Sequence, residues 1–316
     1  MADLRVVTRG SLLARTQTQW VVDQLIAAHL GLTVDIVERT TSGDRIQDKP
    51  LPEVGGKGLF TLELEAALLG GEADLAVHSL KDLPTALPDG LCVGAIPPRE
   101  DPFDALVLPE GQPTPTTDDP LAGLAVGARV GTSSTRRVAL LRHRRPDLII
   151  EPVRGNLDTR LRKLDEGQYD AILLAAAGLR RLGWSARISA RLGLDTMVPA
   201  PAQGALGIEC RAGDPRVAEL LAAIDHAPTR AAADAERAFL AALGGGCLLP
   251  VGAHAEAVGD SLALAVAVAH PAGIEVVQRT AVGPQGEAVS LGKSLAEALL
   301  AEGVGRLLAD VQGSRG

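Results

Sequence analysis

Strand-like and helix-like segments alternate from the first residues of this 316-residue chain. Residues 4–8 and 33–38 have the apolar character of strands, and residues 12–30 between them have the spacing of an amphipathic helix. The alternation continues with a helical segment and two more strands, at 59–69, 73–77 and 106–108. A strand–helix–strand opening is typical of a parallel sheet covered by helices, so we expect an α/β domain.

The pattern changes twice further along the chain. A proline-rich stretch at residues 109–120 predicts a linker or surface loop. A second α/β unit is predicted after it, with strands at 129–130, 148–153 and 171–175 and helices at 135–144 and 156–166. The last part predicts a small α+β domain, with helices at 228–243 and 290–311 and strands at 252–258, 262–268 and 275–280.

Charge is distributed unevenly along the chain. The net charge is −8, yet thirteen arginines lie between Arg129 and Arg191, and with Lys163 added and six carboxylates subtracted this stretch carries +8. Aromatic residues make up only 2% of the sequence, which leaves too few stacking platforms for a single-stranded nucleic acid. We therefore expect a small polyanion as the ligand, and no nucleic acid.

Many of these arginines fall where a strand pattern passes into a helix pattern. In the densest case Ser134 and other hydroxyl-bearing residues precede Arg136 and Arg137. Backbone N–H groups at a helix N-terminus favour anions, and guanidinium groups bind carboxylate or phosphate in a bidentate way. The arrangement recurs at Arg9 with Ser11, at Arg154, at Arg160 and at Arg181. One surface arginine is usually solvated, but five such placements favour an anion site between two α/β domains.

One carboxylate, Asp82, is predicted to lie among these arginines in the same anion site. It follows a buried strand pattern, with Lys81 before it and Leu83-Pro84 after it. An aspartate in this position is often only a turn former. Side chains at the carboxyl ends of strands also line the usual ligand site of open α/β sheets. A carboxylate among arginines would stay ionised and could stabilise a cationic intermediate.

The three cysteines, Cys92, Cys210 and Cys247, fit neither a disulfide framework nor a zinc site. Cys92 and Cys210 lie in apolar surroundings and are predicted to be small buried hydrophobic residues. Cys247 follows three glycines at the end of a helical pattern, where positive φ is permitted. Its thiol is the better candidate for a nucleophile or an attachment point.

Other segments bear on location and access. Residues 55–58 lack the spacing of a phosphate-binding P-loop and predict a gating loop, to which we assign Lys57 and the nearby Phe60. The chain has no run of about 18 apolar residues, and it begins with a charged, strand-like segment rather than a signal peptide. We therefore expect a cytoplasmic protein with no membrane partner. The lack of a long apolar seam predicts a monomer.

Six motifs together resemble the hydroxymethylbilane synthase family, also called porphobilinogen deaminase. They are VGGKGLF at 54–60, HSLKDLP at 78–84, GTSSTRR at 131–137, RGN at 154–156, APAQGALGIE at 200–209 and GGC at 245–247. The motifs follow the family's order and cover nearly the whole chain. The departures are small: residues 112–119 look like an insertion, and Ala202 stands where a glycine is frequent.

The resemblance implies a transferase of tetrapyrrole and haem biosynthesis. It would condense four porphobilinogen molecules head to tail on a dipyrromethane cofactor, release ammonia at each step, and release hydroxymethylbilane by hydrolysis. The cofactor would be joined to Cys247 by a thioether. Asp82 would be the catalytic residue, stabilising the azafulvene-like species and moving protons.

The resemblance also implies roles for the other candidate residues, and no metal. Each pyrrole ring carries two carboxylates, which the cations would bind. The cofactor would contact Lys81, Asp82, Ser134, Arg136, Arg137 and Arg160. The substrate would contact Arg9, Ser11, Arg154, Arg160 and Arg181.

The predicted fold is therefore two periplasmic-binding-protein-like α/β domains flanking a cleft, plus a small α+β C-terminal domain. The predicted boundaries are 1–103 with 204–222, 104–203 and 223–316. Two alternatives stay open: a binding or ligand-sensing protein that holds a small anion without chemistry, and a cysteine-dependent acyl transferase. The acyl transferase would require a histidine base near Cys247. Release of ammonia from porphobilinogen separates the enzyme from both alternatives.

Overall fold

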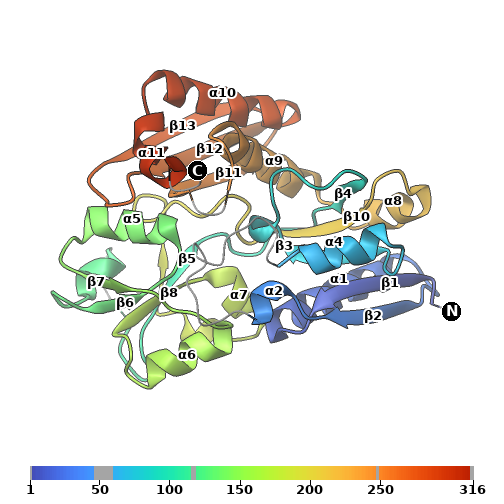
Figure 1. Cartoon of the computed structure of the whole chain (residues 1–316), viewed down its shortest axis with the longest axis horizontal. Coiled ribbons are helices and arrows are strands. Elements are labelled where there is room, and N and C mark those ends of the chain that lie inside the picture. The colour runs from blue at the N-terminus through green and yellow to red at the C-terminus, as the bar shows by residue number, and fades with distance from the viewer. Residues whose placement is uncertain (1, 46–59, 115–118, 247–248, 314–316) are drawn as a thin grey trace.

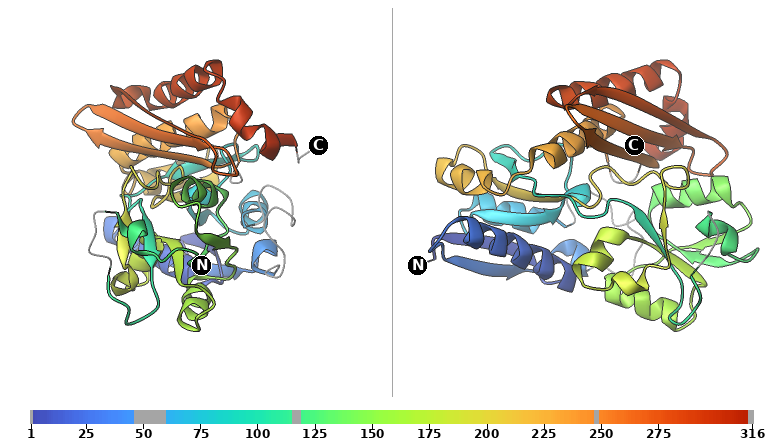
Figure 2. Two further views of the ribbon diagram at one scale, coloured as in Figure 1. Left: turned by 90° about the vertical axis from the view of Figure 1, so that its left-hand side faces the viewer. Right: turned by 180° about the vertical axis from the view of Figure 1, so that it is seen from behind.

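The computed structural model describes residues 2–45, 60–114, 119–246 and 249–313, and it contains two five-stranded sheets and one three-stranded sheet. Figure 1 shows the two larger sheets with helices packed against them, and Figure 2 shows the three-stranded sheet lying over the junction between them. The predicted α/β class, with two such domains and a small C-terminal α+β domain, is confirmed.

The first sheet has the order β2-β1-β3-β10-β4. Strands β1 to β3 are parallel, and β10 runs antiparallel to both β3 and β4. The strands are β1 (Leu4–Arg9), β2 (Val34–Arg39), β3 (Leu75–Ser79), β4 (Leu91–Ala95) and β10 (Leu206–Arg211). The helices of this unit are α1 (Leu12–Ala28), α2 (Ser42–Arg45), η1 (Leu80–Asp82), α4 (Leu62–Leu69) and α8 (Pro215–Ala222).

The second sheet has the order β7-β6-β8-β5-β9. Its strands are β5 (Asp104–Val107), β6 (Arg129–Gly131), β7 (Ile149–Glu151), β8 (Ala171–Ala175) and β9 (Ala190–Leu192). Its helices are η2 (Pro120–Gly123), α5 (Thr135–Arg144), α6 (Leu157–Asp165), α7 (Ala176–Arg181) and η3 (Ser185–Arg187). In each large sheet the fourth position is held by an antiparallel strand that follows a crossing between the sheets. The two units therefore share one topology.

The small domain packs its sheet, of order β11-β12-β13, against helices. Its elements are α9 (Ala227–Ala242), β11 (Val251–Val258), β12 (Ser261–Ala269), β13 (Val276–Pro284), η4 (Gln285–Glu287), α10 (Ala288–Ala301) and α11 (Gly305–Gly313). Ala267 and Ala269 of β12 also belong to the apolar core of the second sheet. This shared core fixes the small domain to its neighbour.

The two crossings between the large sheets lie against each other. The Glu100 amide donates to the Gly204 carbonyl at 3.1 Å. Gly204 has a φ of +87°, and a Cβ there would lie 2.4 Å from the Glu100 oxygen, so only glycine fits. Arg99 donates to both carboxylate oxygens of Glu236 on α9, at 2.7 and 3.0 Å. Glu236, which is fully buried, also accepts the Ala202 amide at 2.5 Å.

The structure corrects one predicted helix, decides between two interpretations of a loop, and contains elements that the sequence did not predict. The predicted helix at 290–311 is wrong, because Gly303 with a φ of +88° separates α10 from α11. The described part of 109–120 leads from β5 to η2 within the second unit, so it is a surface loop and no linker between domains. Strands β4, β9 and β10 and helices α7 and α8 were not predicted from the sequence.

Candidate active site

The sequence-predicted residues follow the carboxyl ends of the parallel strands in both large sheets. Arg9 ends β1, and Ser11 caps α1 by accepting the Ala14 amide at 3.3 Å. Ser134 caps α5 in the same way, accepting the Arg137 amide at 3.5 Å. Such polar caps satisfy backbone N–H groups that a helix leaves without partners. They also fix the backbone from which the neighbouring arginine side chains extend.

Asp82 lies on a short turn of 3-10 helix after β3, and its side chain is exposed. Leu80 anchors this turn, because it is fully buried. Arg237 of α9 holds the turn from the other side, donating to the carbonyls of Leu83 at 2.9 Å and Pro84 at 2.7 Å. The carboxylate is thus presented to solvent from a backbone that two domains fix in place.

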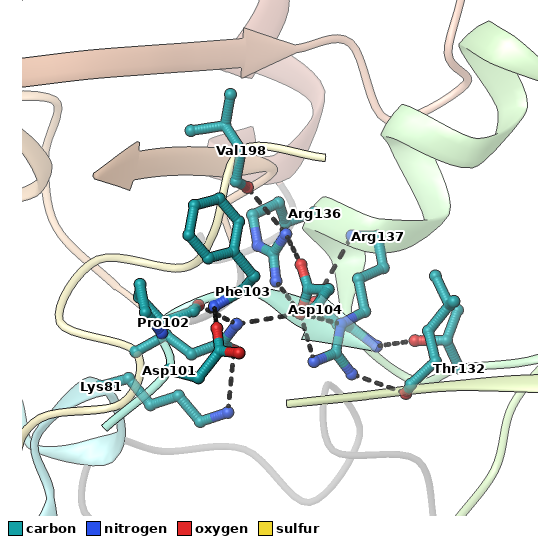
Figure 3. A network of polar contacts seen from close by, with 12 residues as sticks. Lys81, Asp101, Pro102, Phe103, Asp104, Thr132, Arg136, Arg137 and Val198 are labelled. Carbon is teal, nitrogen blue, oxygen red and sulfur yellow. Dashed lines mark hydrogen bonds and ion pairs between the residues drawn. The ribbon is translucent and has the colours of Figure 1, made fainter. Parts of the chain in front are cut away.

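Arg136 and Arg137 converge on Asp104, the first residue of β5, as Figure 3 shows. Arg136 donates to the Asp104 carboxylate at 2.6 and 3.2 Å and to the Val198 carbonyl at 2.8 Å. Arg137 donates to the same carboxylate at 2.9 and 2.6 Å and to the Leu173 carbonyl at 2.8 Å. Asp104 is fully buried. One buried anion therefore orients both guanidinium groups.

Burial alone would raise the pKa of Asp104. The charges of Arg136 and Arg137, with hydrogen bonds from Arg136 and Gln203, outweigh it and hold the pKa well below the usual range. Asp104 is therefore ionised at all ordinary pH values.

Gln203 joins the two halves of the site. Its Nε2 donates to Asp104 at 3.0 Å and to the Pro102 carbonyl at 2.8 Å, and its Oε1 accepts from Lys81 Nζ at 3.1 Å. Gln203 is fully buried. The amide thus turns its donors toward an anion and its acceptor toward a cation. It connects the Lys81–Asp82 turn of the first sheet to the arginine pair of the second.

Three further cations are held partly out of water. Burial lowers the pKa of Lys81 to about 8, and the charge of Arg137 also contributes. Burial lowers the pKa of Arg160 to about 10, helped by the charges of Arg137 and Arg154. Burial lowers the pKa of Arg181 to about 10. The protonated form of each group is disfavoured, so a bound anion would stabilise it.

These cations are also fixed in position. Arg160 Nε donates to the Gly155 carbonyl at 2.8 Å, and Arg181 Nη2 donates to the Gly204 carbonyl at 2.6 Å. The charge of Asp82 acts on both Lys81 and Arg160. Asp82 therefore lies within electrostatic reach of cations from both sheets.

Other predicted residues lie at the edge of this group or outside the described residues. The Arg9 guanidinium stacks on the Phe60 ring, 4.3 Å from its centre. Lys57 and Cys247 fall outside the described residues. The three glycines before Cys247 have φ of 94°, 50° and 139°. A Cβ on Gly245 would lie 3.1 Å from Thr85 Oγ1, so this loop contacts the segment that follows the Asp82 turn.

Sequence reasoning missed Asp104, Gln203, Arg237 and the Arg99–Glu236 pair. Gln203 lies in the APAQGALGIE motif, where a lone amide among small apolar residues is a signal that could have been used. Asp104 gave no such signal, because an aspartate near Pro102 resembles an ordinary turn residue.

Fold and site together define a multidomain α/β enzyme that gathers cations from two sheets around one exposed carboxylate. Residues 4–219 match the porphobilinogen deaminase, dipyromethane cofactor binding domain, and residues 231–301 match the porphobilinogen deaminase C-terminal domain. The chain therefore belongs to the porphobilinogen deaminase family, also known as hydroxymethylbilane synthase. It is a transferase of tetrapyrrole biosynthesis with a dipyrromethane cofactor. The family resemblance inferred from the six motifs is confirmed.

Curated relatives agree over nearly the whole chain. The porphobilinogen deaminase of Syntrophotalea carbinolica is 51% identical over 306 residues, which cover 97% of this chain and 95% of the relative. That of Moorella thermoacetica is 48% identical over 316 residues, with coverage of 100% and 99%. This membership decides against the simple binding protein and against the acyl transferase.

Solved structures give distant similarities. The periplasmic VFT2 domain of BvgS from Bordetella pertussis has a TM-score of 0.40 and 18% identity, covering 70% of this chain and 86% of that one. A YaeC-family lipoprotein from Enterococcus faecalis has a TM-score of 0.40 and 15% identity, covering 71% and 91%. Within the described residues, no helix is long and apolar enough to cross a bilayer.

Proposed function

We propose that this chain builds hydroxymethylbilane from four porphobilinogen molecules on a dipyrromethane primer held by a thioether to Cys247. It acts as a cytoplasmic monomer with domains at 1–103 with 204–222, 104–203 and 223–316. One observation supports this assignment above the others. The charge of Asp82 acts on a cation from each large sheet, Lys81 of the first and Arg160 of the second, and the charge of Arg137 acts on both of these cations.

The residues present fit a ligand with many carboxylates. Lys81, Arg160 and Arg181 each have a pKa lowered by burial, so each gains from a bound anion. Arg136 Nε is buried and has no hydrogen-bond partner within the described residues. A bound carboxylate would supply negative charge to these cations and a hydrogen-bond acceptor to Arg136 Nε. When bound, the primer supplies the pyrrole carbon to which the first substrate is joined.

We assign the binding of primer carboxylates to Lys81, Ser134 and Arg160, with Arg136 and Arg137 beside them. Arg137 already donates from all three nitrogens to protein oxygens, so it acts mainly through its charge. The substrate carboxylates are assigned to Arg9, Ser11, Arg154, Arg160 and Arg181. Lys57 and Phe60 belong to the loop that would control access.

Asp82 carries the chemical step. Its carboxylate is exposed, yet the turn beneath it is held by Leu80 and Arg237. A fixed carboxylate stabilises positive charge that develops on the substrate as ammonia departs, without the cost of reorganisation. The same carboxylate can accept the proton released when the new bond forms, and it can then donate that proton to the leaving amine of the next substrate.

The intact mass of the denatured protein tests the assignment. We expect excess mass equal to two porphobilinogen-derived units in the wild type and its absence in Cys247→Ser. Cys92→Ser is the matched control and should keep the excess, because Cys92 lies on β4 of the first sheet. If the wild type is found at its bare sequence mass, incubation with porphobilinogen should load it and release ammonia. A wild type that stays bare after incubation, or a loaded Cys247→Ser variant, would contradict the proposal.

A further inference from the structure

Cys92 and Cys210 form a pair of thiols that the reaction does not use. They are direct partners in the register of the antiparallel strands β4 and β10. Their sulfur atoms lie 3.7 Å apart, and both thiols are free. Directly opposed residues in antiparallel strands have Cα atoms about 4.5–5.5 Å apart, within the range that a disulfide spans. A small rotation of each side chain would bring the sulfurs to bonding distance, about 2.05 Å.

The two thiols differ in access. Cys92 is partly exposed, whereas Cys210 is 3% exposed and packs above Gly94, where a Cβ would lie 2.8 Å from its sulfur. Arg230 of α9 donates to the Gly94 carbonyl at 3.0 Å and so holds β4 in place beside the two thiols. Because Cys92 is the more exposed of the two, it is the thiol that an oxidant meets first, and Cys210 lies beneath it.

We propose that Cys92 and Cys210 are a redox modification site that forms an internal disulfide with hydroperoxides. Cys92 loses its proton and attacks the peroxide as a thiolate, so that an S–O bond forms and the O–O bond breaks. The departing oxygen takes up a proton, equal to the one that Cys92 lost, and leaves as an alcohol or water. The Cys210 sulfur then attacks the Cys92 sulfur. The S–S bond forms, the S–O bond breaks, and the departing hydroxide leaves as water with the Cys210 proton. Two thiols are oxidised by two electrons, and one hydroperoxide is reduced.

The position of the pair gives the bond a structural consequence. The whole second sheet lies between Cys92 and Cys210 in the chain, as do both crossings between the large sheets. A disulfide here closes a long loop and restricts the unfolded chain, which stabilises the folded state most for long loops. Because β4 and β10 are already paired, the folded protein hardly changes. We expect the oxidised protein to melt about 5 °C higher while it retains its activity.

The test uses the purified holoenzyme and hydrogen peroxide. After treatment, free thiols are blocked with N-ethylmaleimide, and the protein is digested and its peptides are weighed. We expect a peptide that links Cys92 to Cys210, loss of two hydrogens from the intact mass, and reversal by dithiothreitol. The Cys92→Ser and Cys210→Ser variants, which touch no proposed reaction group, should keep basal activity and show neither the link nor the melting shift.

Several outcomes would overturn the proposal. They are oxygen addition at Cys92 without a link, a link to Cys247 in place of Cys210, or two free thiols after treatment. The linked peptide is identified by its own mass, so the result does not depend on whether Cys247 carries the primer. Failure of the redox site and failure of the proposed function are thus separate observations.

Discussion

The Asp104→Asn substitution tests the role of the buried anion between Arg136 and Arg137. Asp104 is fully buried and accepts four hydrogen bonds from the two guanidinium groups, between 2.6 and 3.2 Å. Asparagine keeps the shape of the side chain but removes its charge. It also turns an NH2 group toward other donors. Two buried cations would then face each other without their anion.

The expected loss of stability follows from this geometry. Removing one partner from a buried ion pair costs about 3–5 kcal/mol, because the other charge stays buried without compensation. Here two cations lose their partner, so we place Asp104→Asn near the top of that range. This is a large share of a typical folding free energy of about 5–15 kcal/mol. In the proposed function, a bound primer would supply carboxylates to the same cations. The loss should therefore be smaller in loaded protein than in a Cys247→Ser background.

Urea unfolding followed by circular dichroism measures the loss of stability in the loaded protein and in the Cys247→Ser background. Glu166→Gln is the matched control, because the Arg162–Glu166 pair on the surface of α6 is exposed and should contribute at most about 0.5 kcal/mol. The pKa of Asp104 is lowered in the folded state from 3.8. The contribution of Asp104 to the free energy of unfolding is therefore complete above pH 3.8, and it is lost only as pH falls below that value toward the folded-state pKa. The difference between wild type and Asp104→Asn should stay constant from about pH 7 to pH 5. A loss below about 1 kcal/mol would refute the reasoning.

The remaining predictions concern the cations, the proposed catalytic carboxylate and the junction between the domains. Arg136→Leu should give protein at its bare sequence mass, and recovery of fully loaded variant would contradict its role in seating the primer. Asp82→Asn should keep the primer by mass but lose about 100-fold or more in porphobilinogen turnover, and near-normal turnover would exclude Asp82 as the acid–base group. Burial lowers the pKa of Lys81 to about 8, so loading of the primer onto unloaded protein should weaken as pH rises through that value. Lys81→Arg should flatten this profile, and an unchanged profile would show that another group titrates. Glu236→Gln should cost about 3–5 kcal/mol in urea unfolding, whereas a loss like that of Glu166→Gln would show that the junction does not need its charge.

The sequence predicted the elements whose signals are local. β8 and α5 begin and end where the apolar run and the Ser134 cap indicate. β10 was missed, since its place between β3 and β4 depends on a chain that leaves for the second sheet and returns. The break at Gly303 was missed because apolar spacing continues across it.

The candidate site also contains residues that local sequence signals predicted and residues that they did not. Arginines at strand ends could be predicted, because the end of a strand and the start of a helix are both visible in the sequence. Their partners could not be. Asp104 lies 32 and 33 positions from the two arginines that it binds, and it lies 99 positions from Gln203. Such pairing is decided by the packing of the sheets, which no local pattern reports.

The buried partners change how the cationic site should be understood. If every cation were free for the ligand, the empty site would hold unbalanced charge at a high cost in desolvation. Asp104 offsets part of that charge. The side-chain amide of Gln203 donates to Asp104 and accepts from Lys81, so it links this anion to a further cation. The charge that remains is spread over Lys81, Arg160 and Arg181, whose pKa values are lowered but still at or above neutrality. These groups keep enough positive charge to bind carboxylates one after another. A site of this kind suits a ligand whose negative charge grows with every ring that is added.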